Sequence, residues 1–111
     1  MSGLSTHVLD LTHGRPAAGV AVRLLQGGRL VFSDMTDVDG RCPGLAEVAL
    51  NRGPHRLEFE VADYFRQQGL VLPEPPFLDR VGIDFGVSDA SARYHVPLLV
   101  SPFGYSTYRG S

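Results

Sequence analysis

The stretch Arg56-Leu57-Glu58-Phe59-Glu60-Val61 decides the fold class, because its residues alternate strictly between charged and apolar. Successive side chains of a β-strand point to opposite faces, so a period of two places the three apolar side chains on one face and the three charged side chains on the other. One apolar and one charged face are typical of an antiparallel sheet that covers a core. The sequence therefore predicts a half-buried strand over residues 56–61.

The same alternation recurs on both sides of this stretch. Further strands are predicted at residues 6–11, at 20–24, from residue 30 towards the Asp39-Gly40 turn, at 81–85 and at 94–98, with a short helix only at 62–70. The 13 Gly and 8 Pro fall between the apolar runs, as turns of an all-β protein do. Seven or eight short strands indicate a sandwich or a barrel, and periodicity does not decide between the two.

Length and composition narrow the class of protein. The 111 residues suit one domain, which we assign to residues 1–111, and the hydrophobic fraction of 43% is ordinary for a soluble globular chain. The ten basic residues are all Arg and lie scattered along a chain of net charge −2, unlike the clustered basic face of a nucleic-acid-binding protein. Apolar runs stay well below the roughly 18 residues of a membrane span, and the N-terminus does not resemble a signal peptide. We therefore expect a cytoplasmic protein that binds neither nucleic acid nor membranes.

Two candidate metal features are weak. Cys42 is the single cysteine and has no neighbouring Cys or His at zinc-site spacing, so we expect a small, partly buried thiol. Three aspartates, Asp34, Asp37 and Asp39, precede Gly40, but their spacing is not that of an EF-hand and no Glu closes the loop. Solvated turn residues explain the aspartates better than a calcium site does.

Two of the four histidines are candidates for proton transfer. His7 and His95 each lie in mid-strand, opposite the apolar side chains of that strand, so they project outward if the apolar residues fill the core. Imidazole titrates near pH ~6.5, so either one can accept a proton at neutral pH, although a solvated surface histidine is the alternative. His13 and His55 lie in or beside turns, and we expect both at the surface.

Arg41 and the C-terminal tail are the remaining candidates. Arg41 follows the Asp39-Gly40 turn, where its guanidinium is either a surface charge or a planar set of donors for carbonyl, urea-like or carboxylate groups. The tail of residues 105–111 reads as a strand that ends in the hydroxyl and carboxylate of Ser111, or as an edge strand with a frayed tip. These features alone indicate a β domain with a histidine and arginine site, and leave its function open.

Four segments resemble one known family. Residues 4–10 (LSTHVLD), 14–20 (GRPAAGV), 36–42 (TDVDGRC) and 94–111 (YHVPLLVSPFGYSTYRGS) are similar to the matching segments of the 5-hydroxyisourate hydrolases, also called transthyretin-like proteins. The resemblance extends over nearly the whole chain, and the last block is its most specific part. Residues 11–13 and 77–89 follow the family loosely, and neither stretch carries a catalytic position.

The resemblance implies a fold and an assembly. It implies an all-β, transthyretin-like (prealbumin-like) sandwich of two four-stranded antiparallel sheets, with one short helix after the fifth strand. It also implies a homotetramer, a dimer of dimers whose sheet faces line a central channel that holds the active sites. Polar residues on the outward face of the last strands would then lie at an interface.

The resemblance also implies a reaction of purine breakdown. This is the hydrolysis of 5-hydroxyisourate to 2-oxo-4-hydroxy-4-carboxy-5-ureidoimidazoline, on the way from urate to allantoin, with neither a cofactor nor a metal ion. One of the two histidines, for which His7 is preferred, would activate water, and His95 would be its companion in binding or proton transfer. Arg41 would hold the substrate oxygens and stabilise the oxyanion. Tyr108 and Ser111 would close the pocket and orient the ring, with Ser111 counted among the catalytic residues.

Two other functions share this fold. Transthyretin is a non-catalytic small-molecule carrier, and an adhesive or structural β-sandwich has no small-molecule site. Against the carrier stand His7, Arg41, His95 and the Tyr-Arg-Gly-Ser end, the positions at which carrier and hydrolase diverge. The enzyme is therefore the preferred interpretation.

Overall fold

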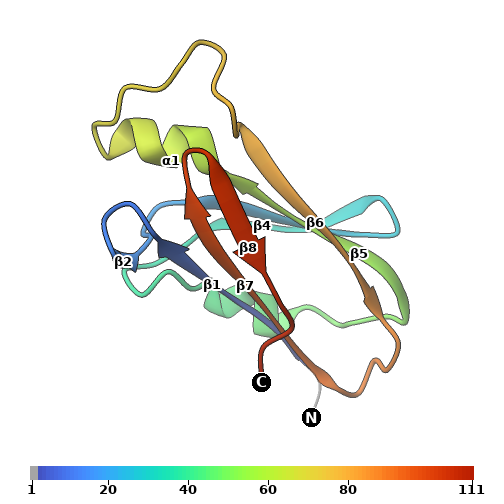
Figure 1. Cartoon of the computed structure of the whole chain (residues 1–111). Coiled ribbons are helices and arrows are strands. Elements are labelled where there is room, and N and C mark those ends of the chain that lie inside the picture. The colour runs from blue at the N-terminus through green and yellow to red at the C-terminus, as the bar shows by residue number, and fades with distance from the viewer. Residues whose placement is uncertain (1–2) are drawn as a thin grey trace.

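Two four-stranded β-sheets pack face to face in a computed structural model that describes residues 3–111 (Figure 1). The first sheet has the order β2-β1-β7-β8, and its strands are β1 (Gly3–Asp10), β2 (Arg15–Pro16), β7 (Arg93–Ser101) and β8 (Gly104–Thr107). The second sheet has the order β4-β3-β5-β6, and its strands are β3 (Ala21–Gln26), β4 (Arg29–Met35), β5 (Gly53–Glu60) and β6 (Arg80–Val87). A 3₁₀ helix, η1 (Pro43–Glu47), and one α-helix, α1 (Val61–Gln67), complete the elements. The predicted sandwich of two four-stranded sheets with a helix after the fifth strand is confirmed.

One pair of strands corrects the expectation that both sheets are antiparallel throughout. β1 and β7 run parallel, in register from Gly3 opposite Arg93 to Asp10 opposite Val100, whereas all other pairs are antiparallel. The chain passes through the whole second sheet between these two strands, so no hairpin fixes their direction. A long crossover is what parallel neighbours require. The first sheet is therefore mixed.

The inner faces of both sheets form one core. Leu57 and Phe59 of β5 are fully buried, as their alternation with charged residues predicts. Val61, expected at the end of this strand, instead begins α1, because Asp79 O accepts hydrogen bonds from the backbone N–H groups of both Val61 and Ala62. The helix buries Tyr64 and Phe65, whose rings meet edge to face. The side chains of the core come from both sheets, from η1, from α1 and from Val20 in the loop before β3: Leu4, Val8, Val20, Val22, Leu24, Leu45, Leu57, Phe59, Val61, Phe65, Val81, Leu98 and Val100.

The charged face of β5 is neutralised by arginines of the same sheet. Glu58 accepts hydrogen bonds from Arg23 Nε at 3.2 Å and from Arg56 Nε at 3.0 Å, and Glu60 accepts from Arg80 Nε at 2.7 Å and from Arg23. Burial opposes ionisation of Glu60, yet these donors hold the pKa of its carboxyl below the usual range. The outer face of the second sheet is thus a set of paired charges.

His55 corrects a second expectation. Its side chain is only 4% exposed, because β5 begins at Gly53 and the period of two places His55 on the inner face with Leu57. Its ring lies 5.5 Å from the ring of Phe85, and Nδ1 lies 3.0 Å from the carbonyl oxygen of Gly53. His55 is therefore a core residue and not a surface one.

Cys42 is buried more completely than the partly buried thiol that was expected, and this burial raises the pKa of its thiol to about 11. His13 is exposed, and its Nδ1 lies 2.6 Å from the buried Asp10 Oδ2 at the end of β1. Over residues 3–111, no helix is both long and apolar enough to cross a membrane.

Candidate active site

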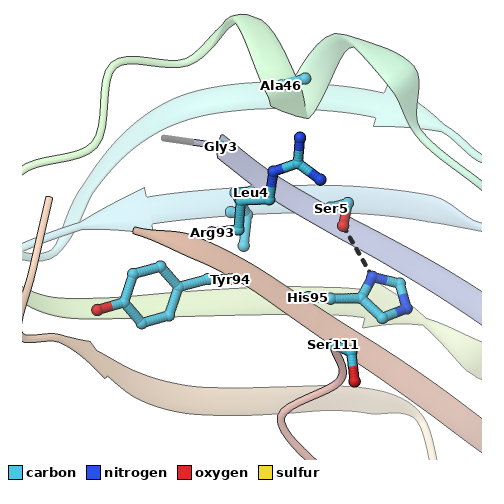
Figure 2. A pocket seen from close by; sticks show the side chains of 8 residues that line it. All are labelled: Gly3, Leu4, Ser5, Ala46, Arg93, Tyr94, His95 and Ser111. Atoms are coloured by element: carbon cyan, nitrogen blue, oxygen red, sulfur yellow. Dashed lines mark hydrogen bonds between the residues drawn. The ribbon is translucent and has the colours of Figure 1, made fainter. Parts of the chain in front are cut away.

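A pocket of about 240 Å³ opens where β1 and β7 meet the C-terminal tail (Figure 2). β1 and β7 form its floor, η1 borders one side, and the tail borders the other. The residues that line it are Gly3, Leu4, Ser5, Ala46, Arg93, Tyr94, His95 and Ser111. His95 and Ser111, both predicted as site residues, therefore share one pocket.

His95 is held between β1 and the tail. Its neighbours Tyr94 and Val96 are buried, so the imidazole projects from the outer face of the first sheet, as predicted. Ser5 lies directly opposite His95 in the β1–β7 register, and its Oγ is 2.8 Å from His95 Nδ1 (Figure 2). On the other side, the backbone N–H of Gly110 donates to His95 O at 2.8 Å.

Gly110 permits a close approach that any other residue would block. A Cβ at this position would lie 2.4 Å from His95 Cδ2, closer than real Cβ contacts come. The backbone of the tail therefore rests against one edge of the imidazole, while Ser5 holds the opposite edge. The ring has little room to turn.

Two other predicted site residues contribute to the electrostatics of His95. Burial lowers the pKa of His95, and the positive charges of Arg41 and of a protonated His7 lower it further. A hydrogen bond with the Ser5 backbone opposes these effects in part. His95 is therefore neutral at pH 7 and able to accept a proton. The three residues predicted to act together thus interact electrostatically.

His7 lies on the same outer face as Ser5, two residues further along β1. Its neighbours Thr6 and Val8 are buried, which confirms the predicted orientation. In the parallel register His7 lies opposite Pro97, two residues beyond His95 on β7. The two histidines are therefore diagonal neighbours on one sheet face.

A tight loop presents Arg41 at the edge of β1. Asp37 Oδ1 accepts hydrogen bonds from the backbone N–H groups of Asp39 at 2.9 Å and Arg41 at 3.0 Å. Gly40 adopts a φ of 73°, and its carbonyl oxygen accepts a hydrogen bond of 2.9 Å from the N–H of Val8, the residue after His7. Asp37 thus organises the loop, as a solvated turn residue does. Within residues 3–111, no carboxylate forms an ion pair with Arg41, so its guanidinium is available to a ligand.

The C-terminal tail is anchored rather than frayed. β8 ends at Thr107, whose hydroxyl donates to Pro97 O at 2.7 Å. Beyond it, the guanidinium of Arg109 lies over the Tyr94 ring, 4.2 Å from its centroid, and donates to Arg93 O at 3.0 Å. These contacts carry Gly110 and Ser111 back across the sheet to the pocket.

Tyr108 lies elsewhere in the single chain. Its side chain is 61% exposed and lines a second depression, of about 340 Å³, between the edge strands β6 and β8. The residues of this depression include Ile83, Phe85, Val96, Thr107 and Arg109. The structure does not bring Tyr108 to the pocket of His95, and its role in binding substrate stays a prediction.

Ser5 and Gly110 are site residues that sequence reasoning missed. Ser5 is two residues before His7, so the period of two of a strand places both on the same face. That spacing could have identified it. For Gly110 no such signal exists, because only the folded tail brings it against the imidazole.

The residues gathered here can add water to a carbonyl group. A neutral imidazole can accept a proton from water, and a guanidinium can stabilise negative charge on the carbonyl oxygen. Within residues 3–111, no three histidine, cysteine or carboxylate side chains gather closely enough to hold a metal ion. That the chain works without a cofactor stays a prediction.

Comparisons with known proteins give one consistent result. Residues 4–110 match the model of the HIUase/Transthyretin family. The chain is 51% identical over 115 residues to the 5-hydroxyisourate hydrolase of Caulobacter vibrioides, and the match covers 100% of both chains.

Solved structures agree with this match. The Klebsiella pneumoniae 5-hydroxyisourate hydrolase superposes with a TM-score of 0.85 at 36% identity, over 100% of this chain and 94% of that one. Sea bream transthyretin, solved in complex with thyroxine, superposes with a TM-score of 0.84 at 28% identity, over 97% of this chain and 94% of that one. The fold is therefore common to hydrolase and carrier, and the sequence is closer to the hydrolases.

Proposed function

We infer that this chain, which belongs to the HIUase/Transthyretin family, is an enzyme that hydrolyses 5-hydroxyisourate in the degradation of urate. The observation that carries this function is the match to hydrolases at 46–51% identity over the full chain. The pocket supports it, because it holds a neutral histidine and the hydroxyl of Ser111, and the guanidinium of Arg41 acts electrostatically on that histidine from outside the lining residues. A carrier of hydrophobic ligands needs none of these groups.

We propose that His95 and His7 activate the attacking water. The water oxygen bonds to the amide carbonyl carbon of the substrate ring, and its proton passes to an imidazole. Arg41 stabilises the negative charge that develops on the carbonyl oxygen, an effect of about 10²–10³-fold for one donor. The carbon–nitrogen bond then breaks, the leaving nitrogen takes the proton from the imidazole, and the ring opens to a carboxylic acid, which gives its remaining proton to solvent and becomes the carboxylate product. The position of the two histidines on one sheet face supports this sharing of a proton.

Ser111 and Tyr108 have binding roles in this proposal. Ser111 lines the pocket beside His95, where its hydroxyl or a carboxylate at this position can orient the ring. Tyr108 closes the pocket only if the tail or a neighbouring subunit brings it there. A peptide fused after Ser111 should therefore reduce kcat/KM far more than the same peptide fused before Met1, and equal rates would refute the role of Ser111.

We also propose that the chain assembles as a homotetramer, a dimer of dimers. β6 and β8 each pair with one strand only and lie at the same edge of the sandwich, so a second copy can continue both sheets there. The outer face that carries His7 and His95 would then face another dimer across a channel. Size-exclusion chromatography should give the size of four subunits, and a monomer that hydrolyses the substrate at full rate would contradict this assembly. Location in the cytoplasm stays a prediction, which cell fractionation tests.

Activity tests the function directly. With 5-hydroxyisourate generated in place from urate, the ultraviolet signal of the substrate should disappear much faster with the protein than without it. Substitution of His7 by alanine should slow this decay by about 10²–10⁴-fold, because a positioned base contributes that much. Arg29→Ala is the control, since Arg29 is an exposed residue of β4 in the other sheet. Decay at the spontaneous rate with tight thyroxine binding would favour the carrier instead.

A further inference from the structure

Ser5 is a polar side chain that contacts the imidazole of His95 from the neighbouring strand. Its Oγ lies 2.8 Å from His95 Nδ1, within normal hydrogen-bond distance. The two residues are direct partners in the parallel pair of β1 and β7, and on the inner side of this pair the Thr6 hydroxyl donates to Val96 O at 2.6 Å. The register of the sheet therefore maintains the contact between Ser5 and His95.

The position of Gly110 makes this contact select one orientation of the ring. A ring flip would exchange Nδ1 with Cδ2, and would place a carbon against the Ser5 hydroxyl and a nitrogen against the Gly110 backbone. In the observed orientation the nitrogen meets the hydroxyl and the carbon meets the glycine. The second ring nitrogen, Nε2, points away from Ser5 (Figure 2).

The remaining question is which ring nitrogen carries the proton. A hydroxyl can either donate to Nδ1 or accept from it. A proton acceptor needs an open lone pair, and Nε2 is the ring nitrogen that points away from Ser5 (Figure 2). The hydroxyl must therefore accept from Nδ1 if His95 is to take a proton on this open side. An N–H at Nδ1 leaves the lone pair of the neutral ring on Nε2.

We propose that Ser5 is a positioning residue of the hydrolase: its hydroxyl oxygen accepts the Nδ1–H of His95 and leaves Nε2 as the proton acceptor that faces the substrate. The proposal rests on the catalytic role proposed for His95. It adds the atom that takes the proton and the residue that fixes this choice. Ser5 itself does not contact the reacting atoms.

Nitrogen NMR of the intact protein tests the contact without reference to turnover. Protein labelled with ¹⁵N-histidine at a pH at which His95 is neutral should show Nδ1 with the shift of a protonated nitrogen and Nε2 with that of an unprotonated one. Ser5→Ala should move both shifts towards the average of two tautomers, and Ser5→Thr should restore them because it keeps the hydroxyl. A wild-type protein with the proton on Nε2, or an unchanged spectrum in Ser5→Ala, would overturn the proposal.

Kinetics test the consequence. Loss of one hydrogen bond should lower kcat/KM by about 3- to 10-fold in Ser5→Ala, with recovery in Ser5→Thr. Ser33→Ala is the matched control, because Ser33 is an exposed strand residue of β4 in the other sheet. If Ser5 acts only through His95, the double variant Ser5→Ala/His95→Ala should be no slower than His95→Ala alone. A double variant whose loss of kcat/KM equals the product of the two single losses would overturn the positioning role of Ser5.

The two proposals fail in different ways. Wild-type turnover in His95→Ala would refute the catalytic role of His95 and, with it, the role of Ser5. An inactive His95→Ala together with an unchanged tautomer in Ser5→Ala would refute the role of Ser5 alone.

Discussion

Replacement of Gly40 by alanine should damage both stability and activity, whereas the same change at Gly28 should damage neither beyond a small conformational effect. Both glycines have a positive φ, 73° at Gly40 and 83° at Gly28, and alanine in this region costs about 1–2 kcal/mol. A Cβ at Gly28 would meet no atom within 4 Å. A Cβ at Gly40 would lie 2.5 Å from the carbonyl oxygen of Val8, which is backbone and cannot move aside alone. The two variants therefore separate conformational strain from close approach.

The magnitude follows from the hydrogen bond that must break. To relieve the contact, the loop has to move away from β1, which disrupts the bond of 2.9 Å from Val8 N–H to Gly40 O and leaves a buried group unpaired, at about 1–3 kcal/mol. We expect a total loss of about 2–5 kcal/mol for Gly40→Ala against about 1–2 kcal/mol for Gly28→Ala. The same movement displaces Arg41, and a displacement of about 1 Å can lower kcat/KM by up to ~10²-fold.

Urea unfolding and the decay of 5-hydroxyisourate measure the two effects. Both variants should be compared with wild type at one subunit concentration, because the stability of an oligomer depends on concentration. Equal losses of stability in the two variants, together with unchanged kcat/KM in Gly40→Ala, would show that the close contact of Gly40 with Val8 affects neither stability nor activity.

Three further outcomes are expected. Arg109→Gln should lower kcat/KM and leave the core intact, because it removes the cation–π contact with Tyr94 that anchors the tail. An activity assay checks the loss of kcat/KM and near-ultraviolet circular dichroism checks the core. Full activity in this variant would contradict the prediction. Burial tends to raise the pKa of the Asp10 carboxyl, but hydrogen-bond donors led by His13 outweigh burial and hold that pKa below the usual range. The ionised Asp10 therefore stabilises the fold at any pH above its unfolded pKa of about 3.9. This stabilisation is lost as the pH falls through the lowered pKa of the folded state. Asp10→Asn should thus lose about 1–2 kcal/mol in urea at pH 7 and approach wild type at pH 3, whereas a constant difference would show that ionisation is irrelevant. Burial lowers the pKa of His95, and the positive charge of Arg41 lowers it further. Arg41→Ala should therefore raise the pKa of His95 in an NMR titration. An unchanged titration curve would show that Arg41 does not lie near the imidazole.

The fold could be predicted where charged and apolar residues alternate strictly along the sequence. The charged and apolar rows of residues 56–60 match the two faces of β5, and the short helix begins one residue earlier than expected. His55 was assigned to the surface because Pro54 suggested a turn, but β5 begins at Gly53 and extends through both. The parallel pairing of β1 with β7 could not be predicted from the alternation of residues. Alternation shows which face of a strand each side chain lies on, but not the direction in which neighbouring strands run.

The site was predictable in its residues and not in its geometry. His7 and His95 were identified by their place opposite apolar neighbours, and the structure puts both on one outer face. The hydrogen bond from Val8 N–H to Gly40 O holds the loop of Arg41 beside β1, the strand that carries His7. This contact joins residues that are far apart in the sequence. Long-range contacts of this kind depend on topology, so a local pattern could not supply them.

The most direct test of the account compares the ultraviolet decay of 5-hydroxyisourate with wild-type protein, Arg41→Ala and His95→Ala. Arg29→Ala is the control, since Arg29 is an exposed residue at the start of β4 in the other sheet. We expect fast decay with wild type and Arg29→Ala, and a loss of at least about 10²-fold in both site variants. Site variants as fast as wild type would contradict the proposed site, and wild-type decay no faster than the spontaneous reaction would contradict the hydrolase itself.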